Sequence, residues 1–121
     1  MTHSLAIQLF VPGRVTNVLN GSHRTWHARH DWALTWRQRT AVAWLEAGRP
    51  TWAGPARITF TAYVGRLFDD DNLASCCKPI RDEAVKRVLG TDDGPTCGHA
   101  FFYGQQVRPH YRGVLVTVEP R

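Results

Sequence analysis

The sequence has few cysteines, few acidic residues and no long hydrophobic run. Its only cysteines are Cys76, Cys77 and Cys97, and an odd number with two adjacent is a poor framework for disulfides. The pairing of Cys97 with His99 also fits a structural zinc site poorly, so we expect free thiols. No stretch reaches the roughly 18 apolar residues that a membrane-spanning helix needs, and the N-terminal segment is too short in its apolar part for a secretory signal. We therefore expect a cytoplasmic protein without a membrane partner.

The composition that is present is typical of one globular domain. Hydrophobic residues make up 43% of the chain and charged residues 21%, which is close to the average for soluble proteins. A chain of 121 residues is long enough to bury one hydrophobic core but not a second. We expect a single domain that spans residues 1–121.

Basic residues outnumber acidic residues, 15 to 10, which gives a formal net charge of +5. Half of the acidic residues lie in two clusters, 69–71 and 92–93, so the rest of the chain is more basic still. A basic surface favours a nucleic-acid partner, because lysines and arginines that neutralise phosphates release bound counterions. A general preference for arginine in the source is the alternative explanation of this composition.

Apolar periodicity and turn residues divide the chain into six elements, in the order strand, helix, strand, helix, strand, strand. The predicted elements cover residues 5–11, 31–47, 56–68, 79–89, 99–107 and 111–119. Glycines follow both helices, as is common at helix ends. The last two strands are separated by a short turn and predict a terminal hairpin. This order favours a two-layer α+β domain with a mixed sheet of about four strands and two main helices.

Tryptophans and a proline give two further expectations about the helices. The tryptophans of the first helix, which include Trp32, Trp36 and Trp44, are spaced to face the core rather than to stack on bases. Pro79 lacks a backbone N–H and disfavours helical geometry at Lys78. The sequence therefore predicts a short turn at 72–77 and a regular helix only from about residue 79.

Asp69 and Asp71 follow the second predicted strand. If strand geometry continues to this point, their side chains project to the same side of the chain while Asp70 points away. Two ionised carboxylates that face each other repel unless a cation lies between them, and Mg²⁺ prefers such oxygen ligands. A third carboxylate, from Asp92 or Asp93, returns after the second helix. The pattern indicates a metal-dependent site acting on phosphates, with the Lys78 ammonium as an additional positive charge.

Simpler interpretations of the two acidic clusters remain. The sequence DDDN is typical of a helix N-cap and TDDG of a turn. An EF-hand loop that begins at Asp69 is excluded, because its sixth position, which requires glycine, is Ala74. A D-x-D site for nucleotide sugars generally needs a larger nucleotide-binding domain than this chain can form.

The stretch 69–94, DDDNLASCCKPIRDEAVKRVLGTDDG, resembles the core of the RusA family of Holliday junction resolvases, in particular its phage and prophage members. The shared features are D-x-D-N-L, a lysine, an Arg-Asp pair, an apolar helix and a terminal Asp-Asp. The chain length and the order of elements also fit. The resemblance implies a small α+β homodimer that binds four-way DNA junctions during recombination and repair. It also implies paired nicks made with Mg²⁺, for which Mn²⁺ can substitute.

The resemblance assigns roles to individual residues. It implies that Asp69, Asp71 and Asp93 bind the metal and are catalytic, that Lys78 is catalytic, and that Asp82 either supports the residues of the site or is structural. The alternative is a non-catalytic nucleic-acid-binding accessory protein that has kept the fold and lost turnover.

DNA contacts are expected from an arginine-rich segment, because the acidic site itself repels phosphate until a metal binds. The segment GSHRTWHARHDWALTWRQR holds Arg24, Arg29, Arg37 and Arg39. We interpret it as a loop and helix start that follow the phosphate backbone. Arginines that are simply solvated are the structural alternative.

Overall fold

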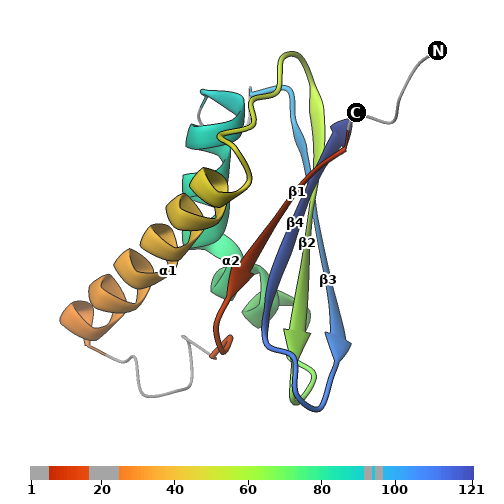
Figure 1. The fold of residues 1–121 in the computed structure, drawn as a ribbon. Helices are drawn as coiled ribbons and strands as arrows, with labels where there is room; N and C mark the ends of the chain where they lie inside the picture. The colour runs from red at the N-terminus through yellow and green to blue at the C-terminus, as the bar shows by residue number, and fades with distance from the viewer. Residues whose placement is uncertain (1–5, 17–24, 92–93, 95–96) are drawn as a thin grey trace.

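The computed structural model describes residues 6–16, 25–91, 94 and 97–121, and it confirms the two-layer α+β fold with the order β-α-β-α-β-β (Figure 1). The elements are β1 (Ile7–Pro12), α1 (Trp26–Glu46), β2 (Ala56–Val64), α2 (Asp70–Ala84) with its π-helical continuation η1 (Val85–Leu89), β3 (Ala100–Val107) and β4 (Gly113–Pro120). No helix among the described residues is long and apolar enough to cross a membrane.

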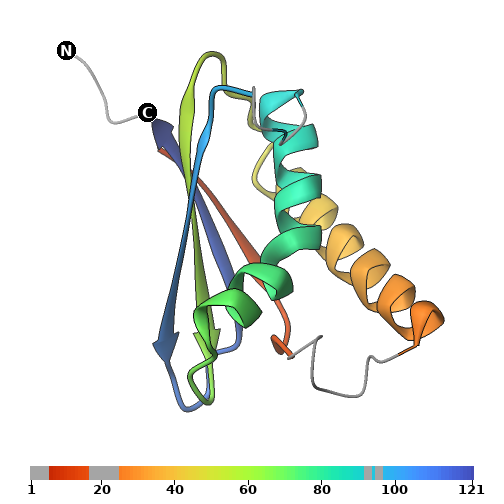
Figure 2. The same ribbon diagram turned by 180° about the vertical axis from the view of Figure 1, so that it is seen from behind.

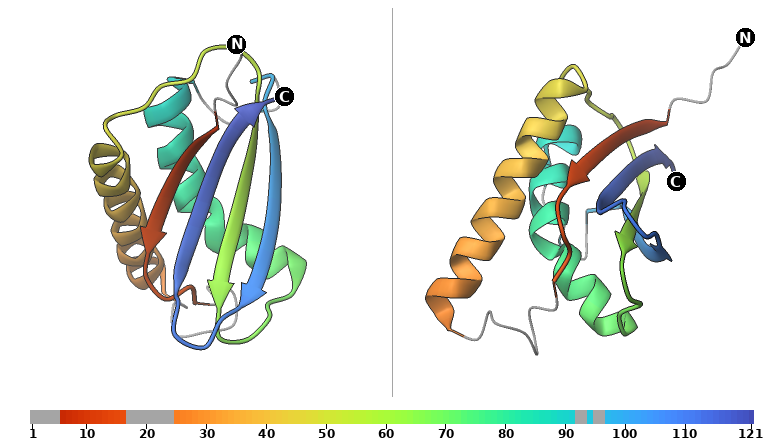
Figure 3. Two further views of the ribbon diagram at one scale, coloured as in Figure 1. Left: turned by 45° about the vertical axis from the view of Figure 1, so that its right-hand side comes forward. Right: turned by 60° about the horizontal axis from the view of Figure 1, so that its bottom comes forward.

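The four strands form one mixed sheet in the order β1-β4-β2-β3. β4 lies antiparallel to both β1 and β2, whereas β3 lies parallel to β2. Strands β1, β2 and β3 therefore end at one edge of the sheet, where β4 begins (Figure 3, left). We call this edge the carboxyl edge, and α2 begins beside it.

Both helices pack on the same face of the sheet, as the two opposite views show (Figures 1 and 2). β2 confirms its predicted alternation, with Ile58 and Phe60 fully buried towards the helices. Trp36 of α1 is 3% exposed, and Trp32 and Trp44 pack against the same core. The prediction that the tryptophans serve the core is thus confirmed, and the core fixes α1 and α2 relative to the carboxyl edge.

α2 is longer than the sequence predicts. It runs from Asp70 through Pro79, so the predicted turn at 72–77 is wrong. Its inner face buries Leu73, Cys76, Cys77 and Ile80, and this burial outweighs the hydrogen bond that Pro79 removes. The axis of α2 bends between its first turns and the remainder (Figure 2), as expected for a helix with an internal proline.

α1 also begins earlier than the predicted residue 31. The Thr25 hydroxyl accepts a hydrogen bond of 3.1 Å from the Ala28 N–H and caps the helix before Trp26. Residues 26–30 are basic and aromatic without apolar periodicity, and Trp26 is 69% exposed. The periodic apolar residues by which a helix is predicted from sequence are therefore missing from this first turn.

The predicted hairpin of the last two strands is wrong, because β2 lies between β3 and β4. The β2–α2–β3 connection returns β3 parallel to β2, as is usual for strands joined by a helix. β4 then pairs with the other side of β2 and brings residues 108–112 across the carboxyl edge.

Candidate functional site

Asp69, Asp70 and Asp71 lie at the N-terminus of α2, next to the carboxyl edge. β2 ends at Val64, and Asp69 is the N-cap residue of α2, with φ −65° and ψ 152°. Asp70 and Asp71 belong to the first helical turn, where negative charge interacts favourably with the helix dipole. The expectation that Asp69 and Asp71 converge because they extend a strand is therefore wrong. All three side chains are exposed.

The Asp69 carboxylate does not cap the helix, although aspartate at this position commonly accepts hydrogen bonds from the first helical N–H groups. Exposed carboxylates that make no capping bond fit a hard divalent cation, and Mg²⁺ is commonly held by one or two carboxylates together with water and substrate phosphate. The donor set of Asp69 and Asp71 fits this description. Within residues 6–16, 25–91, 94 and 97–121, no three His, Cys, Asp or Glu side chains are grouped around a metal position. The predicted third ligand, Asp93, lies outside the described residues.

Gln105 of β3 fixes the segment that leads into this acidic turn. Its Nε2 donates to the Phe68 carbonyl and its Oε1 accepts from the Phe68 N–H, both at 2.8 Å. The side-chain amide thus pairs with the backbone of Phe68 as a neighbouring strand would. Because Asp69 follows Phe68 directly, this pair sets the position from which the Asp69 carboxylate projects.

An arginine flanks every strand at the carboxyl edge. Arg14 follows β1, Arg66 follows β2, Arg108 follows β3 and Arg112 precedes β4. Arg14, Arg66 and Arg112 line a cavity of about 780 Å³ together with Val15, Thr16, Gly65 and Phe68. We call this cavity the arginine cleft. It reaches Phe68, the residue before Asp69, so the acidic turn lies at its border.

A second cavity of about 440 Å³ shares Arg14 and Thr16 with the arginine cleft and continues along α1. Its lining includes Arg39, which lies over the Trp36 ring with 5.1 Å between the guanidinium carbon and the ring centroid. Of the other arginines predicted to contact DNA, Arg29 is exposed on the first turns of α1 and Arg24 lies outside the described residues. These contacts stay predictions.

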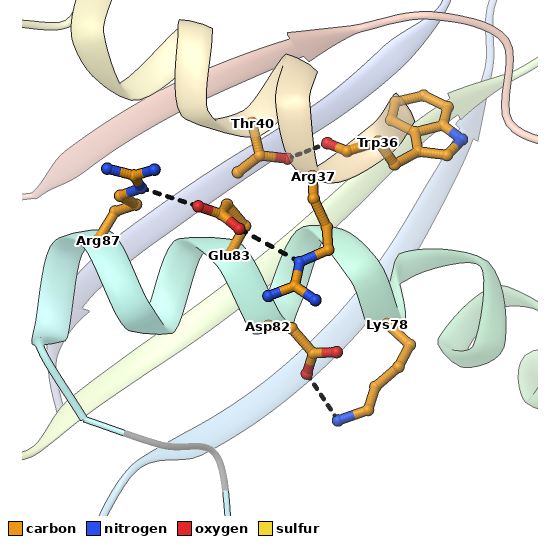
Figure 4. Close-up of polar contacts among 7 residues, drawn as sticks. All are labelled: Trp36, Arg37, Thr40, Lys78, Asp82, Glu83 and Arg87. Carbon is orange, nitrogen blue, oxygen red and sulfur yellow. Dashed lines mark hydrogen bonds and ion pairs between the residues drawn. The ribbon is translucent and has the colours of Figure 1, made fainter. Parts of the chain in front are cut away.

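Arg37 has a partner within the protein (Figure 4). Its Nε lies 3.2 Å from Oε1 of Glu83 on α2, and Arg87 Nε lies 2.8 Å from Oε2. Burial tends to raise the pKa of Glu83, but hydrogen bonds and charge from Arg87 and Arg37 outweigh it, so this pKa lies below its usual 4.5. The three residues join α1 to α2, which gives Arg37 a structural role whether or not it also contacts DNA.

Lys78 projects from α2 about 10 Å further along the helix than Asp71, at 1.5 Å per residue. Its ammonium lies 2.8 Å from Oδ1 of Asp82, one turn away (Figure 4). This agrees with a structural part for Asp82. The Lys78 side chain is 54% exposed and lines a small cavity between α2 and α1. Its predicted catalytic role remains a prediction.

No family model matches the sequence, and the comparison with curated proteins found no significant match. The resemblance to the RusA family therefore rests on residues 69–94 and stays a prediction. Sequence reasoning missed Gln105, Arg14, Arg66 and Arg112. The only signal for Gln105 is a polar residue inside an aromatic strand, and the arginines share only their position at strand ends.

Proposed function

We propose that this protein is a metal-dependent DNA endonuclease of the junction-resolving type, which cuts four-way DNA by paired nicks. One observation supports this proposal most strongly. The exposed acidic turn of Asp69 and Asp71 begins directly after Phe68, which lines a cleft whose charged lining residues are all arginines. Carboxylates suit a divalent cation and arginines suit phosphate, and a nuclease requires both side by side.

Each group would do a separate part of the chemistry. Arginines hold the phosphate backbone and keep a strand in place next to the acidic turn. The carboxylates of Asp69 and Asp71, with Asp93 as a predicted third, would hold Mg²⁺. When bound, the metal supplies an activated water and stabilises charge on the attacking and leaving oxygens. Gln105 keeps the backbone before Asp69 in one position, so the Asp69 side chain projects from a fixed point of the chain.

Cleavage of a synthetic four-way junction in Mg²⁺ tests the proposal. We expect the wild-type protein to cut the junction and Asp71→Asn to lose at least about a hundredfold in rate, the scale seen when one electrostatic contact to a transition state is removed. Glu46→Gln is the matched control, because it removes one negative charge from an exposed residue outside the candidate site, the last residue of α1. Asp71→Asn should still bind the junction.

The competing function is nucleic-acid binding without turnover, which the arginine cleft also supports. Tight binding of the junction with no cleavage by the wild-type protein in either Mg²⁺ or Mn²⁺ would favour it. Cleavage that is equally fast in Asp71→Asn would also contradict the proposed site.

A further inference from the structure

The arginine cleft has a composition that suits an anion. Its charged lining residues are Arg14, Arg66 and Arg112, and no described carboxylate forms an ion pair with any of them. Three guanidinium groups around one cavity repel each other, and a bound anion relieves this repulsion. Guanidinium groups are planar, always charged, and match the oxygens of a phosphate in pairs.

The cleft is held in shape by contacts from three elements. Cys76 of α2 donates its S–H to the Thr16 carbonyl at 2.8 Å, which fixes the segment that carries Arg14. The Gly13 N–H donates to the Arg112 carbonyl at 3.4 Å and joins the ends of β1 and β4. The Arg112 guanidinium donates to the carbonyls of Arg108 and Tyr111. Contacts within the protein thus hold the Arg112 guanidinium and the backbone next to Arg14 in place.

Gly65 allows Arg112 to reach this position. A Cβ atom at residue 65 would lie 2.6 Å from Nη2 of Arg112, which is too close for two non-bonded atoms. Gly65 does not have a positive φ, so its backbone accepts an alanine. The substitution Gly65→Ala therefore displaces the Arg112 guanidinium without changing any charge.

We propose that the arginine cleft binds the phosphate backbone of the DNA strand that enters the acidic turn. The inference rests on the proposed function for the identity of the anion. The cavity of about 780 Å³ is larger than one phosphate requires, and it shares Arg14 with the second cavity, whose charged lining residues are Arg14, Arg39 and the carboxylate Asp31. This shape suits a chain of successive phosphates better than a single small anion. The strand leaves the cleft at Phe68, directly before Asp69.

Binding of a fluorescent four-way junction in EDTA, at several salt concentrations, tests the inference separately from cleavage. The variants are Arg66→Ala, Arg14→Ala and Gly65→Ala. Arg57→Ala is the matched control, because it removes the same charge at the far end of β2, where Arg57 lies over Phe102. One lost phosphate contact lowers the slope of log K against log salt by about 0.9, which is about eightfold in affinity at 0.1 M salt.

We expect Arg66→Ala and Arg14→Ala to lose about eightfold in affinity and to show a smaller slope of log K against log salt. We expect Arg57→Ala to change neither quantity much. Gly65→Ala should weaken binding at unchanged net charge, which a general electrostatic effect cannot produce. Equal affinities for the cleft variants and the Arg57→Ala control would overturn the inference, even if cleavage still depends on Asp71. Cleft-dependent binding without cleavage by the wild type would sustain the inference and refute the nuclease. A wild-type protein that binds no junction at low salt would refute both.

Discussion

The contact between Gln105 and Phe68 gives the sharpest test of how the acidic turn is positioned. Gln105→Met keeps the length of the side chain and removes both hydrogen bonds to the Phe68 backbone. Each such bond contributes about 1 kcal/mol net, so the free energy of unfolding should fall by about 2 kcal/mol. The free energy of unfolding of a domain of this size is usually about 5–15 kcal/mol, so the variant should remain folded.

The effect on activity should exceed the effect on stability. Asp69 follows Phe68, and a displacement of about 1 Å at a catalytic group can lower a rate about a hundredfold. We expect slower junction cleavage and a higher Mg²⁺ concentration for half-maximal rate, with binding in EDTA unchanged within about twofold. Gln106→Met is the control, since the side chain of the neighbouring Gln106 accepts a hydrogen bond from Arg108 and, among the described residues, makes no other. Urea unfolding and cleavage assays on both variants provide the measurements.

Two results would refute this reasoning. If Gln105→Met unfolds at the same urea concentration as the wild type, the two hydrogen bonds contribute nothing to stability. If it is destabilised but cleaves with an unchanged rate and Mg²⁺ requirement, the contact supports the fold without positioning Asp69.

Three further predictions concern α2. Glu83→Gln should be about 1–3 kcal/mol less stable than the wild type at pH 7. The folded-state pKa of Glu83 is lowered, so protonation at acid pH removes this stabilisation from the wild type. The difference in urea stability between the two proteins should therefore become smaller below about pH 4.5. Lys78→Ala should change thermal stability by at most about 0.5 kcal/mol, because its pair with Asp82 is exposed, and a larger loss would show a structural role. Burial raises the pKa of Cys77 to about 12, so a thiol reagent at pH 8 should modify Cys97 first in the native protein; rapid modification of all three thiols would contradict this burial.

The sequence predicts the elements that depend on local pattern. The alternation around Phe60 identifies β2, and Gly90 ends the second helix in the left-handed conformation that favours glycine, with φ 66°. Prediction from the sequence fails where contacts between residues far apart in the chain determine the local structure. Pro79 indicates a break, but the inner face of α2 is buried along its length, and tertiary packing overrides the local preference.

The candidate site divides in the same way. The acidic cluster Asp69–Asp71 is visible in the sequence, because three adjacent carboxylates are unusual in a basic chain. The pair of Gln105 with Phe68 spans 37 residues, and no local pattern marks it. The arginine cleft depends on the strand order β1-β4-β2-β3, in which β4 lies between β1 and β2 and brings Arg112 to the sheet edge where Arg14 and Arg66 lie.

The central claim is that the acidic turn holds the divalent cation used for cleavage. Crystals soaked in Mn²⁺, with the metal located by its anomalous scattering, test this claim most directly. We expect a peak within coordination distance, about 2.0–2.2 Å, of carboxylate oxygens from Asp69 and Asp71, and we expect this peak to disappear in crystals of Asp71→Asn. If no peak is found at this turn, at a Mn²⁺ concentration that supports junction cleavage in solution, the acidic turn does not hold the metal.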